Sequence, residues 1–394
     1  MSLNPDFVVI GAGIAGASVA CALQEHGDVV LLEREALPGH HTTGRSAAFL
    51  VESYGPPAVR LLTRASRSFL SEPPDGFSEI PLVHSNPMLW IAREDQRKIL
   101  EQALQEGRAA GSPVEAIDAV AAREVCPVLR EDYVAAATIE WAALHIDVSA
   151  LLDAFVREFR GRGGRLVGAA PVEKIVRQGG FWQVEAGGEH YATQSVINAA
   201  GAWAEQVGHL AGAASIGLRP LRRTAITFAP PEAADVRSWP CVVDAEEDFY
   251  FKPEGVRLLA SPCDETPMDP CDVSPDDYEV ALVAERVQRA THLKIRHIEN
   301  RWAGLRSFVA DRAPVIGLDP EQQGFFWLAG QGGFGIMTAP AAARAAAGLV
   351  VEGALPDDLL AEGLTEEALS PTRLRAAAGL PTSPARSGLS EPPG

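Results

Sequence analysis

The feature that most constrains the fold of this chain is a glycine-rich turn near its amino terminus. The turn, Gly11–Gly16, follows a short apolar run at Phe7–Ile10 and precedes a stretch of good helix formers that ends near His26. A second apolar run, Val29–Leu32, stops at Glu33, which lies 17 positions beyond the last glycine of the turn. A strand, a Gly-x-Gly-x-x-Gly turn, a helix and a second strand ending in an acid are typical of a dinucleotide-binding unit. The sequence therefore predicts an α/β fold with a Rossmann-like domain.

Each glycine of the turn has its own physical role in such a unit. Gly11 permits the tight turn, Gly13 lets a pyrophosphate approach the backbone, and Gly16 lets the helix pack closely on the strand. The first amides of the helix then face the phosphates. Glu33 would accept hydrogen bonds from a ribose 2′-hydroxyl, which favours FAD or NAD over NADP.

The composition excludes several classes of protein. The chain carries a formal net charge of −18, so its surface as a whole repels nucleic acids and anionic lipid headgroups. It has no uninterrupted apolar run of about 18 residues, so no membrane span is expected. The five cysteines form no Cys-x-x-Cys pair and fit neither a zinc site nor a disulfide framework. This cysteine usage indicates a reduced cytoplasm and no metal centre.

The length of 394 residues predicts more than one domain. After the first unit come strand-like segments such as Thr224–Phe228 and Arg257–Ser261. They are followed by an apolar strand at Phe325–Ala329 and by a second glycine-rich turn at Gly330–Gly335, which leads into a helix. We therefore expect two interleaved domains, the first formed by residues 1–85, 146–220 and 300–370 and the second by residues 86–145 and 221–299. Residues 371–394 are rich in Pro, Ser, Gly and Ala and contain no aromatic residue, which predicts a disordered tail.

Five ordered sequence blocks carry a resemblance to a known family. They are VVIGAGIAGAS at 8–18, TTGRSAA at 42–48, VINAAGAW at 196–203, WAGLRSF at 302–308 and GQGGFGI at 330–336. From about Asp6 to Arg373 the chain resembles the FAD-dependent D-amino acid oxidase and glycine oxidase superfamily, and within it the bacterial D-arginine dehydrogenase type. The resemblance implies a Rossmann-like FAD-binding domain interleaved with a substrate domain built on an antiparallel sheet.

The resemblance also implies a noncovalently bound FAD. The first glycine turn would hold the pyrophosphate, the Val172 backbone would lie near the adenine, and amides of the second glycine turn would stabilise charge on the reduced flavin. His40 and His41 are interpreted as polar loop residues rather than as sites of covalent attachment. The expected cofactor-binding residues are Gly11, Gly13, Ile14, Ala15, Gly16, Glu33, Arg34, Thr42, Thr43, Gly44, Arg45, Ser46, Ala47, Ala48, Phe49, Val172, Ala200, Gly201, Trp203, Gly332, Gly333, Phe334, Gly335, Ile336 and Met337.

The same resemblance implies a substrate site that binds a carboxylate. Arginine suits this role because its planar guanidinium matches a carboxylate in two hydrogen bonds. Arg306 lies in an otherwise apolar strand, where a guanidinium needs an anionic partner. Arg223 is the second expected ligand, although the sequence alone does not choose between it and its neighbour Arg222. The residues expected to bind and position the substrate are Tyr54, Arg223, Tyr250, Arg306 and Gly333.

Two departures from the D-arginine type bear on the substrate. Met88 stands where that type has an acid for the substrate guanidinium, and Phe49 stands where it has a histidine near the substrate amine. With Leu50 and Met337 nearby, these residues predict an apolar side-chain pocket. A cationic side chain would lose its solvation there without gaining a partner. The alternative is that Met88 and Phe49 are ordinary core residues.

The resemblance therefore implies oxidation of D-amino acids with neutral or apolar side chains, by hydride transfer from Cα to flavin N5 and hydrolysis of the imino acid to a 2-oxo acid and ammonia. Four alternatives stay open. They are a secondary-amine oxidase or dehydrogenase acting on glycine, sarcosine or proline, a 2-hydroxy acid dehydrogenase of the same fold, a flavin-binding protein without turnover, and an NAD-dependent dehydrogenase. The electron acceptor is either oxygen or a quinone-like compound.

Overall fold

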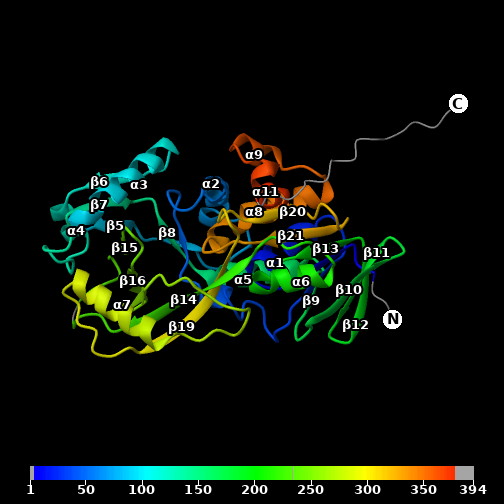
Figure 1. The fold of residues 1–394 in the computed structure, drawn as a ribbon, viewed down its shortest axis with the longest axis horizontal. Helices are drawn as coiled ribbons and strands as arrows, with labels where there is room; N and C mark the ends of the chain where they lie inside the picture. The colour runs from blue at the N-terminus through cyan, green and yellow to red at the C-terminus, as the bar shows by residue number, and fades with distance from the viewer. Residues whose placement is uncertain (1–3, 233, 378–394) are drawn as a thin grey trace.

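The computed structural model describes residues 4–232 and 234–377 and divides them between two main β-sheets. In Figure 1 the sheet that contains β1, β13 and β21 lies on the right, with helices packed on it. Strands β5, β7, β15 and β16 of the other sheet lie on the left, and its long strands β14 and β19 reach toward the first sheet (Figure 1). The predicted combination of α/β and antiparallel parts is confirmed.

The first sheet has six strands in the order β20-β21-β13-β1-β2-β9. The bounds of its strands are β1 (Phe7–Ile10), β2 (Val29–Leu32), β9 (Arg165–Val167), β13 (Ser195–Asn198), β20 (Val315–Leu318) and β21 (Phe325–Ala329). All neighbours are parallel except β20 and β21. Strands β2 and β21 are buried along their whole length. Their uninterrupted apolar sequences follow from this, because other layers cover both faces of the sheet.

Helices cover one face of this sheet, and a smaller sheet covers the other. The helices are α1 (Ile14–Leu23), α5 (Val148–Gly161) and α8 (Gly335–Val351), with α2 (Pro57–Ser71) packed against α8. The opposite face packs against α6 (Ala204–Leu210) and a sheet of β10 (Val172–Gln178), β11 (Phe181–Ala186) and β12 (Glu189–Thr193). Side chains of β1 alternate between the two layers, since Val9 contacts the helical side and Val8 and Ile10 contact the other.

The second sheet has nine strands and is mostly antiparallel. Eight follow the order β18-β14-β17-β16-β15-β5-β7-β6, and β19 pairs along β14. Their bounds are β5 (Met88–Ala92), β6 (Glu115–Ile117), β7 (Ala136–Glu140), β14 (Arg219–Phe228), β15 (Cys241–Asp244), β16 (Tyr250–Glu254), β17 (Arg257–Ser261), β18 (Thr266–Pro267) and β19 (Asn300–Phe308). Strands β15 and β5 are parallel, with Cys241 opposite Met88. The predicted antiparallel sheet is therefore a mixed one.

The remaining elements join or flank the two sheets. Helices α4 (Ala119–Val125) and α7 (Asp277–Ala290) share an apolar core with the nine-stranded sheet. The others are the sheet of β3 (Phe49–Leu50), β8 (Leu144–Ile146) and β4 (Val83–Ser85), the helices α3 (Arg97–Ala109), α9 (Asp357–Ala361), α10 (Glu366–Leu369) and α11 (Thr372–Ala377), and the 3-10 turns η1 (Thr43–Arg45), η2 (Glu94–Gln96) and η3 (Gly201–Trp203). Within residues 4–232 and 234–377, none of the helices combines the length and the apolar character needed to cross a membrane.

Two sequence-based boundaries need correction. Strand β19 begins the segment 300–370 that we assigned to the FAD-binding domain, but it pairs with β14 along its whole length and belongs to the nine-stranded sheet. Local hydropathy predicts a strand and does not reveal its partner. The tail predicted from residue 371 begins with helix α11, in which Arg373 pairs with Asp311 at 2.7 Å. Composition cannot show such a distant ion pair, and residues 378–394 of that prediction lie outside the described residues.

Candidate active site

The turn after β1 needs glycine at two positions, because neighbouring backbone atoms leave no room for a Cβ there. Gly11 has a φ of +99°, and a Cβ there would lie 2.6 Å from the carbonyl oxygen of Ala199. A Cβ on Gly16 would lie 1.7 Å from the carbonyl oxygen of Gly11, so α1 can pack this closely only with glycine at that position. The turn therefore brings the start of α1 to the carboxyl end of β1, where parallel α/β sheets bind their ligands.

Glu33, directly after β2, holds this turn from the other side. One of its carboxylate oxygens accepts a hydrogen bond from the Ala12 N–H at 2.7 Å, and the other accepts one from the Glu35 N–H at 2.9 Å. The side chain is buried and lines a cavity beside Arg34. Glu33 thus lies where the ribose of a dinucleotide was expected, and its contact with a ribose hydroxyl stays a prediction.

Two adjoining cavities cross this end of the six-stranded sheet. One has a volume of about 320 Å³ and reaches Glu33, Val172 and Trp203. The other has a volume of about 140 Å³ and reaches the second glycine turn at Gly332. The residues that line both cavities are Gly13, Thr42, Thr43, Ala199, Gly201 and Ala202. The two cavities therefore form one elongated cleft, and the sequence analysis predicts the adenosine at its Glu33 end and the flavin ring at its Gly332 end.

Most of the predicted cofactor-binding residues line this cleft. They are Gly11, Gly13, Ile14, Ala15, Glu33, Arg34, Thr42, Thr43, Arg45, Ser46, Ala47, Ala48, Val172, Ala200, Gly201, Trp203, Gly332, Gly333, Gly335 and Ile336. Phe49 and Met337 line a third cavity instead, which is described below. Gly16, Gly44 and Phe334 line none of the three cavities. Contact of these three residues with FAD stays a prediction.

Aromatic and charged side chains surround Trp203 at the adenosine end of the cleft. The Arg34 guanidinium lies 4.6 Å from the Trp203 ring centroid, and the His41 ring lies 4.5 Å from it. His41 Nε2 lies 2.9 Å from a carboxylate oxygen of Glu35, and this hydrogen bond lowers the pKa of Glu35. Flat and cationic groups of this kind are suited to stacking on an adenine.

Several buried polar atoms of the cleft have no hydrogen-bond partner among the described residues. They are His41 Nδ1, Arg223 Nε, Ser307 Oγ and Gln331 Nε2. Buried polar atoms nearly always have a partner, so this group indicates a polar ligand. Helix α8 also begins at Gly335 in the same cavity, and its first amides favour negative charge. This donor set fits FAD, whose pyrophosphate and reduced flavin are anionic.

The sequence analysis missed three of these four residues as ligands. Ser307 and Gln331 lie inside the WAGLRSF and GQGGFGI blocks, so their positions carried a signal. His41 was assigned to the cofactor loop only as a polar residue. What the sequence could not show is that each side chain is buried without a partner.

A third cavity, of about 80 Å³, lies beside the Gly332 end of the cleft, where the flavin is predicted. Tyr54, Arg223, Tyr250, Arg306 and Gly333 all line it. Arg223 of β14 and Arg306 of β19 come from paired strands, in which Gly304 lies opposite Arg223. Because Arg306 is two residues from Gly304, its side chain emerges on the same face of the sheet as that of Arg223. The strand pairing therefore brings two guanidinium groups to one cavity.

The structure separates Arg223 from its neighbour Arg222. Successive residues of β14 point to opposite faces of the sheet. Arg222 pairs with Asp264 at 3.3 Å and with Asp276 at 3.6 Å, and it does not line the third cavity. Of the two arginines that the sequence left open, Arg223 is the one that reaches the cavity.

The two arginines of the cavity differ in their partners. Arg223 is only 8% exposed and donates a hydrogen bond from Nη2 to Glu265 at 3.1 Å. Among the described residues, no hydrogen bond or ion pair reaches the guanidinium of Arg306. An unpaired guanidinium on a cavity wall is available to an anionic ligand.

The two tyrosines of the cavity are protonated hydrogen-bond donors. Burial and the charge of Glu247 raise the pKa of Tyr54. Burial also raises the pKa of Tyr250 to about 12. A phenol with a raised pKa keeps its proton near neutral pH, so these groups can donate hydrogen bonds but cannot act as general bases there.

The remaining walls of the third cavity are largely apolar. They include Phe49, Val51, Met88, Trp90, Cys241, Val243 and Met337. Leu50, which we predicted to line this pocket, is instead fully buried in the core beside the six-stranded sheet. Side chains alternate along β3, so Leu50 points away from the cavity that Phe49 reaches. The prediction for Leu50 was wrong because it treated neighbouring residues as one surface.

Glu247 is an acid of this cavity that the sequence analysis missed. Its backbone has a φ of +56°, in the left-handed region that few residues other than glycine adopt. The hydroxyl of Tyr54 donates a hydrogen bond to its carboxylate at 3.1 Å. In the sequence Glu247 is one of several acids before β16, and nothing local distinguishes it from its neighbours.

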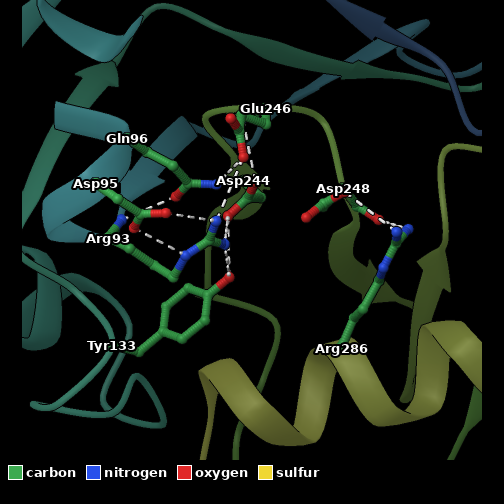
Figure 2. A network of polar contacts seen from close by, with 8 residues as sticks. All are labelled: Arg93, Asp95, Gln96, Tyr133, Asp244, Glu246, Asp248 and Arg286. Atoms are coloured by element: carbon green, nitrogen blue, oxygen red, sulfur yellow. Dashed lines mark hydrogen bonds and ion pairs between the residues drawn. The ribbon is translucent and has the colours of Figure 1, made fainter. Parts of the chain in front are cut away.

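Asp244 anchors the turn that carries Glu247 from outside the cavity. Figure 2 shows its buried carboxylate among side chains of neighbouring elements, where it accepts hydrogen bonds from Gln96 Nε2 at 2.9 Å and from the Tyr133 hydroxyl at 3.0 Å. Arg93 lies 3.7 Å from the same carboxylate (Figure 2). These contacts hold the turn between β15 and β16 and so compensate for the strained backbone at Glu247.

Comparison with known families gives a match that spans most of the chain. The family described as FAD dependent oxidoreductase matches residues 6–349. Glycine oxidase of Geobacillus kaustophilus is 24% identical over 93% of this chain and 98% of its own length. Mitochondrial dimethylglycine dehydrogenase of Rattus norvegicus is 25% identical over 90% of this chain and 44% of its own length. The chain spans about half the length of the first curated relatives, for example 54% of anaerobic glycerol-3-phosphate dehydrogenase subunit A1 of Haloferax volcanii, which is 28% identical over 77% of this chain.

Solved structures share the fold over nearly the whole chain. L-proline dehydrogenase from P. horikoshii superposes with a TM-score of 0.84 at 21% identity, covering 96% of this chain and all (100%) of that one. Glycine oxidase from Geobacillus kaustophilus gives a TM-score of 0.80 at 23% identity, covering 89% and 95% of the two chains. L-alpha-glycerophosphate oxidase from Mycoplasma pneumoniae, solved with FAD bound, gives 0.79 at 18% identity, covering 88% and 94%.

Proposed function

The chain belongs to the FAD-dependent oxidoreductase family, and from this premise we propose that it oxidises D-amino acids with neutral or apolar side chains to 2-oxo acids and ammonia. The immediate product would be an imino acid, which water hydrolyses. When bound, FAD would supply the oxidising chemistry by accepting the hydride of the substrate Cα at N5. The names of the relatives and structural neighbours, which include glycine oxidase and L-proline dehydrogenase, support an amino acid substrate.

The observation that carries the proposal is the convergence of two arginines between two cavities. Arg223 and Arg306 line both the flavin end of the cleft and the third cavity. Gly333, from the second glycine turn, also lines both. A substrate carboxylate bound by the two guanidinium groups would therefore hold its Cα close to the flavin site, and orientation of this kind supplies much of the rate enhancement in such a reaction.

The other polar groups of the cavity would position the substrate. Tyr250 keeps its proton and would donate a hydrogen bond to the carboxylate, whereas Tyr54 donates its hydrogen bond to Glu247 and would stay close to the carboxylate as a neutral group. If the amine binds in its neutral form, no protein base is needed before the hydride leaves. The residues that would hold the FAD are those of the cleft, with Ser307, Gln331 and His41 added to the predicted set.

The apolar walls support a neutral substrate side chain. Met88, Trp90 and Val243 offer no partner to a guanidinium or ammonium group, and burying an unpaired charge there would cost several kcal/mol. Glu247 also lines the cavity, where its carboxylate accepts the hydrogen bond of Tyr54, so the proposal of a neutral side chain concerns the walls formed by Met88, Trp90 and Val243. Assignment of the D enantiomer rests on the sequence resemblance.

A second candidate function is oxidation of a secondary amine. It is favoured by the names of dimethylglycine dehydrogenase and L-proline dehydrogenase among the similar proteins. The apolar walls of the third cavity, which include Met88, Trp90 and Val243, suit a substrate with an apolar side chain better than they suit glycine or sarcosine. We therefore rank this function second.

The environment and partners of the proposed enzyme follow from its chemistry. All five cysteines are free thiols, which supports a reducing compartment such as the cytoplasm. The proposed partners are a small-molecule amino acid and an electron acceptor, either oxygen or a quinone-like compound.

Anaerobic bleaching of the flavin absorbance tests the function directly. The panel is D-Leu, D-Met, D-Phe, D-Arg, L-Leu, glycine, sarcosine, L-proline and D-lactate. We expect rapid bleaching by the apolar D-amino acids, weak bleaching by D-Arg and none by L-Leu. Bleaching by sarcosine or L-proline alone would establish the second candidate, and bleaching by D-lactate alone would establish a 2-hydroxy acid dehydrogenase.

A further inference from the structure

A single carboxylate ties the buried arginine of the substrate cavity to an arginine at the surface. Glu265 lies in the turn between β17 and β18 and accepts a hydrogen bond from Arg223 Nη2 at 3.1 Å. The same carboxylate oxygen accepts one from Arg312 Nη2 at 2.6 Å, and the other oxygen accepts one from Arg312 Nη1 at 3.0 Å. Glu265 therefore makes a two-bond pair with Arg312 and a single hydrogen bond with Arg223.

The bridge runs from the cavity to the solvent. The side chains of Arg223, Glu265 and Arg312 are 8%, 35% and 45% exposed. Burial favours the neutral acid, but the hydrogen bond and charge of Arg312 outweigh it and hold the pKa of Glu265 below its usual range. Glu265 is therefore a carboxylate at neutral pH.

Arg312, the most exposed member of this group, packs on Phe308 next to the second glycine turn. The Arg312 guanidinium lies 3.8 Å from the centroid of the Phe308 ring. That ring packs on the second glycine turn so closely that a Cβ on Gly332 would lie 2.0 Å from it. The position of Glu265 is thus fixed relative to the turn that lines the flavin end of the cleft.

The positive charges of Arg223 and Arg306 are only partly balanced by acidic partners. Arg306 has no hydrogen-bond or ion-pair partner among the described residues, and Arg223 keeps Nε buried and unpartnered. Asp264, the neighbour of Glu265, is occupied on the other face of the sheet with Arg222. The clamp formed by Arg223 and Arg306 therefore carries two positive charges, and Glu265 offsets part of one of them.

We propose that Glu265 is a positioning residue that sets the strength of the carboxylate clamp: it holds Arg223 through Nη2, leaves Nε for the ligand, and offsets part of the clamp's charge. Arg312 pairs with the same carboxylate and neutralises part of its charge, so it weakens the effect of Glu265 on Arg223. The inference rests on the proposed function only in that Arg223 and Arg306 bind a carboxylate. Substrate and 2-oxo acid product both carry that group, and two uncompensated arginines would retain the product.

The proposal predicts effects of opposite sign at the two ends of the bridge. Glu265→Gln removes a negative charge next to the bound carboxylate, so benzoate, a simple monocarboxylate, should bind roughly two- to fivefold more tightly. Arg312→Met leaves Glu265 paired with Arg223 alone, so benzoate should bind more weakly by a similar factor. Methionine keeps an apolar stem over Phe308. A merely structural bridge would weaken binding in both variants.

The experiment is a benzoate titration of the FAD-loaded protein, followed by flavin absorbance and by calorimetry. Glu265→Asp keeps the charge but shortens the side chain by one methylene, so its benzoate affinity should lie between those of the wild type and Glu265→Gln. Glu185→Gln and Arg344→Met each break a surface ion pair, with Lys174 and with Asp358, and should leave benzoate affinity unchanged. Changes of the same sign in Glu265→Gln and Arg312→Met, or no change in either, would overturn the proposal.

One further variant separates this proposal from the proposed function. Arg306→Met removes the unpaired guanidinium and should weaken benzoate binding by about 30-fold or more. If it does so while Glu265→Gln and Arg312→Met fail to move in opposite directions, only the role of Glu265 is refuted. If Arg306→Met leaves benzoate affinity unchanged, the carboxylate clamp itself is wrong.

Discussion

Replacing Arg306 by methionine should abolish most of the activity without lowering the stability of the protein. The loss of a charge-assisted contact to a carboxylate costs about 2–5 kcal/mol, which corresponds to a fall in kcat/KM of about 30-fold to several thousand-fold. The stability should not fall, because the guanidinium has no hydrogen bond or ion pair with any described residue to lose. Arg306→Lys keeps the charge without the planar fork and should give an intermediate kcat/KM.

The matched control for this prediction is Arg222→Met. Arg222 lies next to Arg223 but pairs with the buried carboxylate of Asp264 on the opposite face of the sheet. Its loss should lower the free energy of unfolding by about 2 kcal/mol, less than for an isolated buried pair because Thr224 still donates to Asp264. Its kcat/KM with a good D-amino acid should change little.

The assay combines steady-state kinetics with thermal unfolding of the FAD-loaded variants. The expected pattern is a large loss of kcat/KM with an unchanged Tm for Arg306→Met, and the reverse for Arg222→Met. The reasoning is refuted if Arg306→Met keeps kcat/KM within a few-fold of the wild type, or if both variants lose activity and Tm together. In the second case Arg306 would be a structural residue.

Three further predictions concern the buried residues Met88 and Gly16 and the half-buried His145. Met88→Glu supplies the acid that the apolar wall lacks, so the ratio of kcat/KM for D-Arg to that for D-Leu should rise by about tenfold or more; an unchanged ratio would exclude Met88 from contact with the substrate side chain. Gly16→Ala places a methyl group 1.7 Å from the Gly11 carbonyl oxygen, so the purified protein should carry little FAD, measured as flavin absorbance per chain; full occupancy would contradict the close packing. Burial, with a smaller effect of Lys252, lowers the pKa of His145 from 6.5 to about 4. As the pH drops, the unfolded chain binds the proton before the folded one does, so the free energy of unfolding should fall by about 2 kcal/mol at most between pH 6.5 and pH 4. Urea titrations over that range should show that the free energy of unfolding of His145→Gln depends less on pH than that of the wild type.

Strands with continuous apolar runs could be predicted from the sequence. Strands β1, β2, β17 and β21 occupy the residues that we predicted, because each run is bounded by glycine or polar residues. Strand β14 was predicted from Thr224 but begins at Arg219. Its first half carries arginines on both faces, so local hydropathy does not predict a strand there, and the strand forms by pairing with β19 on one side and β18 on the other.

The parts of the site that escaped prediction depend on contacts between distant segments. The choice of Arg223 over Arg222 depends on which face of β14 meets Asp264. The role of Glu265 requires Arg312, which is 47 residues away in the chain. Sequence patterns identify residue types that can bind a ligand, while the direction of each side chain follows from strand register and from partners that no local pattern contains.

Strand β19, which we predicted in the FAD-binding domain, explains why the proposed substrate site and the proposed flavin site lie next to each other. Strand β19 pairs with β14 in the nine-stranded sheet, and directly after it the chain enters β20 of the six-stranded sheet. At this crossing the Gly332 N–H donates a hydrogen bond to the Ser307 carbonyl oxygen at 2.9 Å, one residue beyond Arg306. The arginine of one sheet is therefore held against the glycine turn of the other by backbone contacts. A substitution that weakens this junction should disturb carboxylate binding and FAD binding together, whereas substitutions at Glu265 should affect only carboxylate binding.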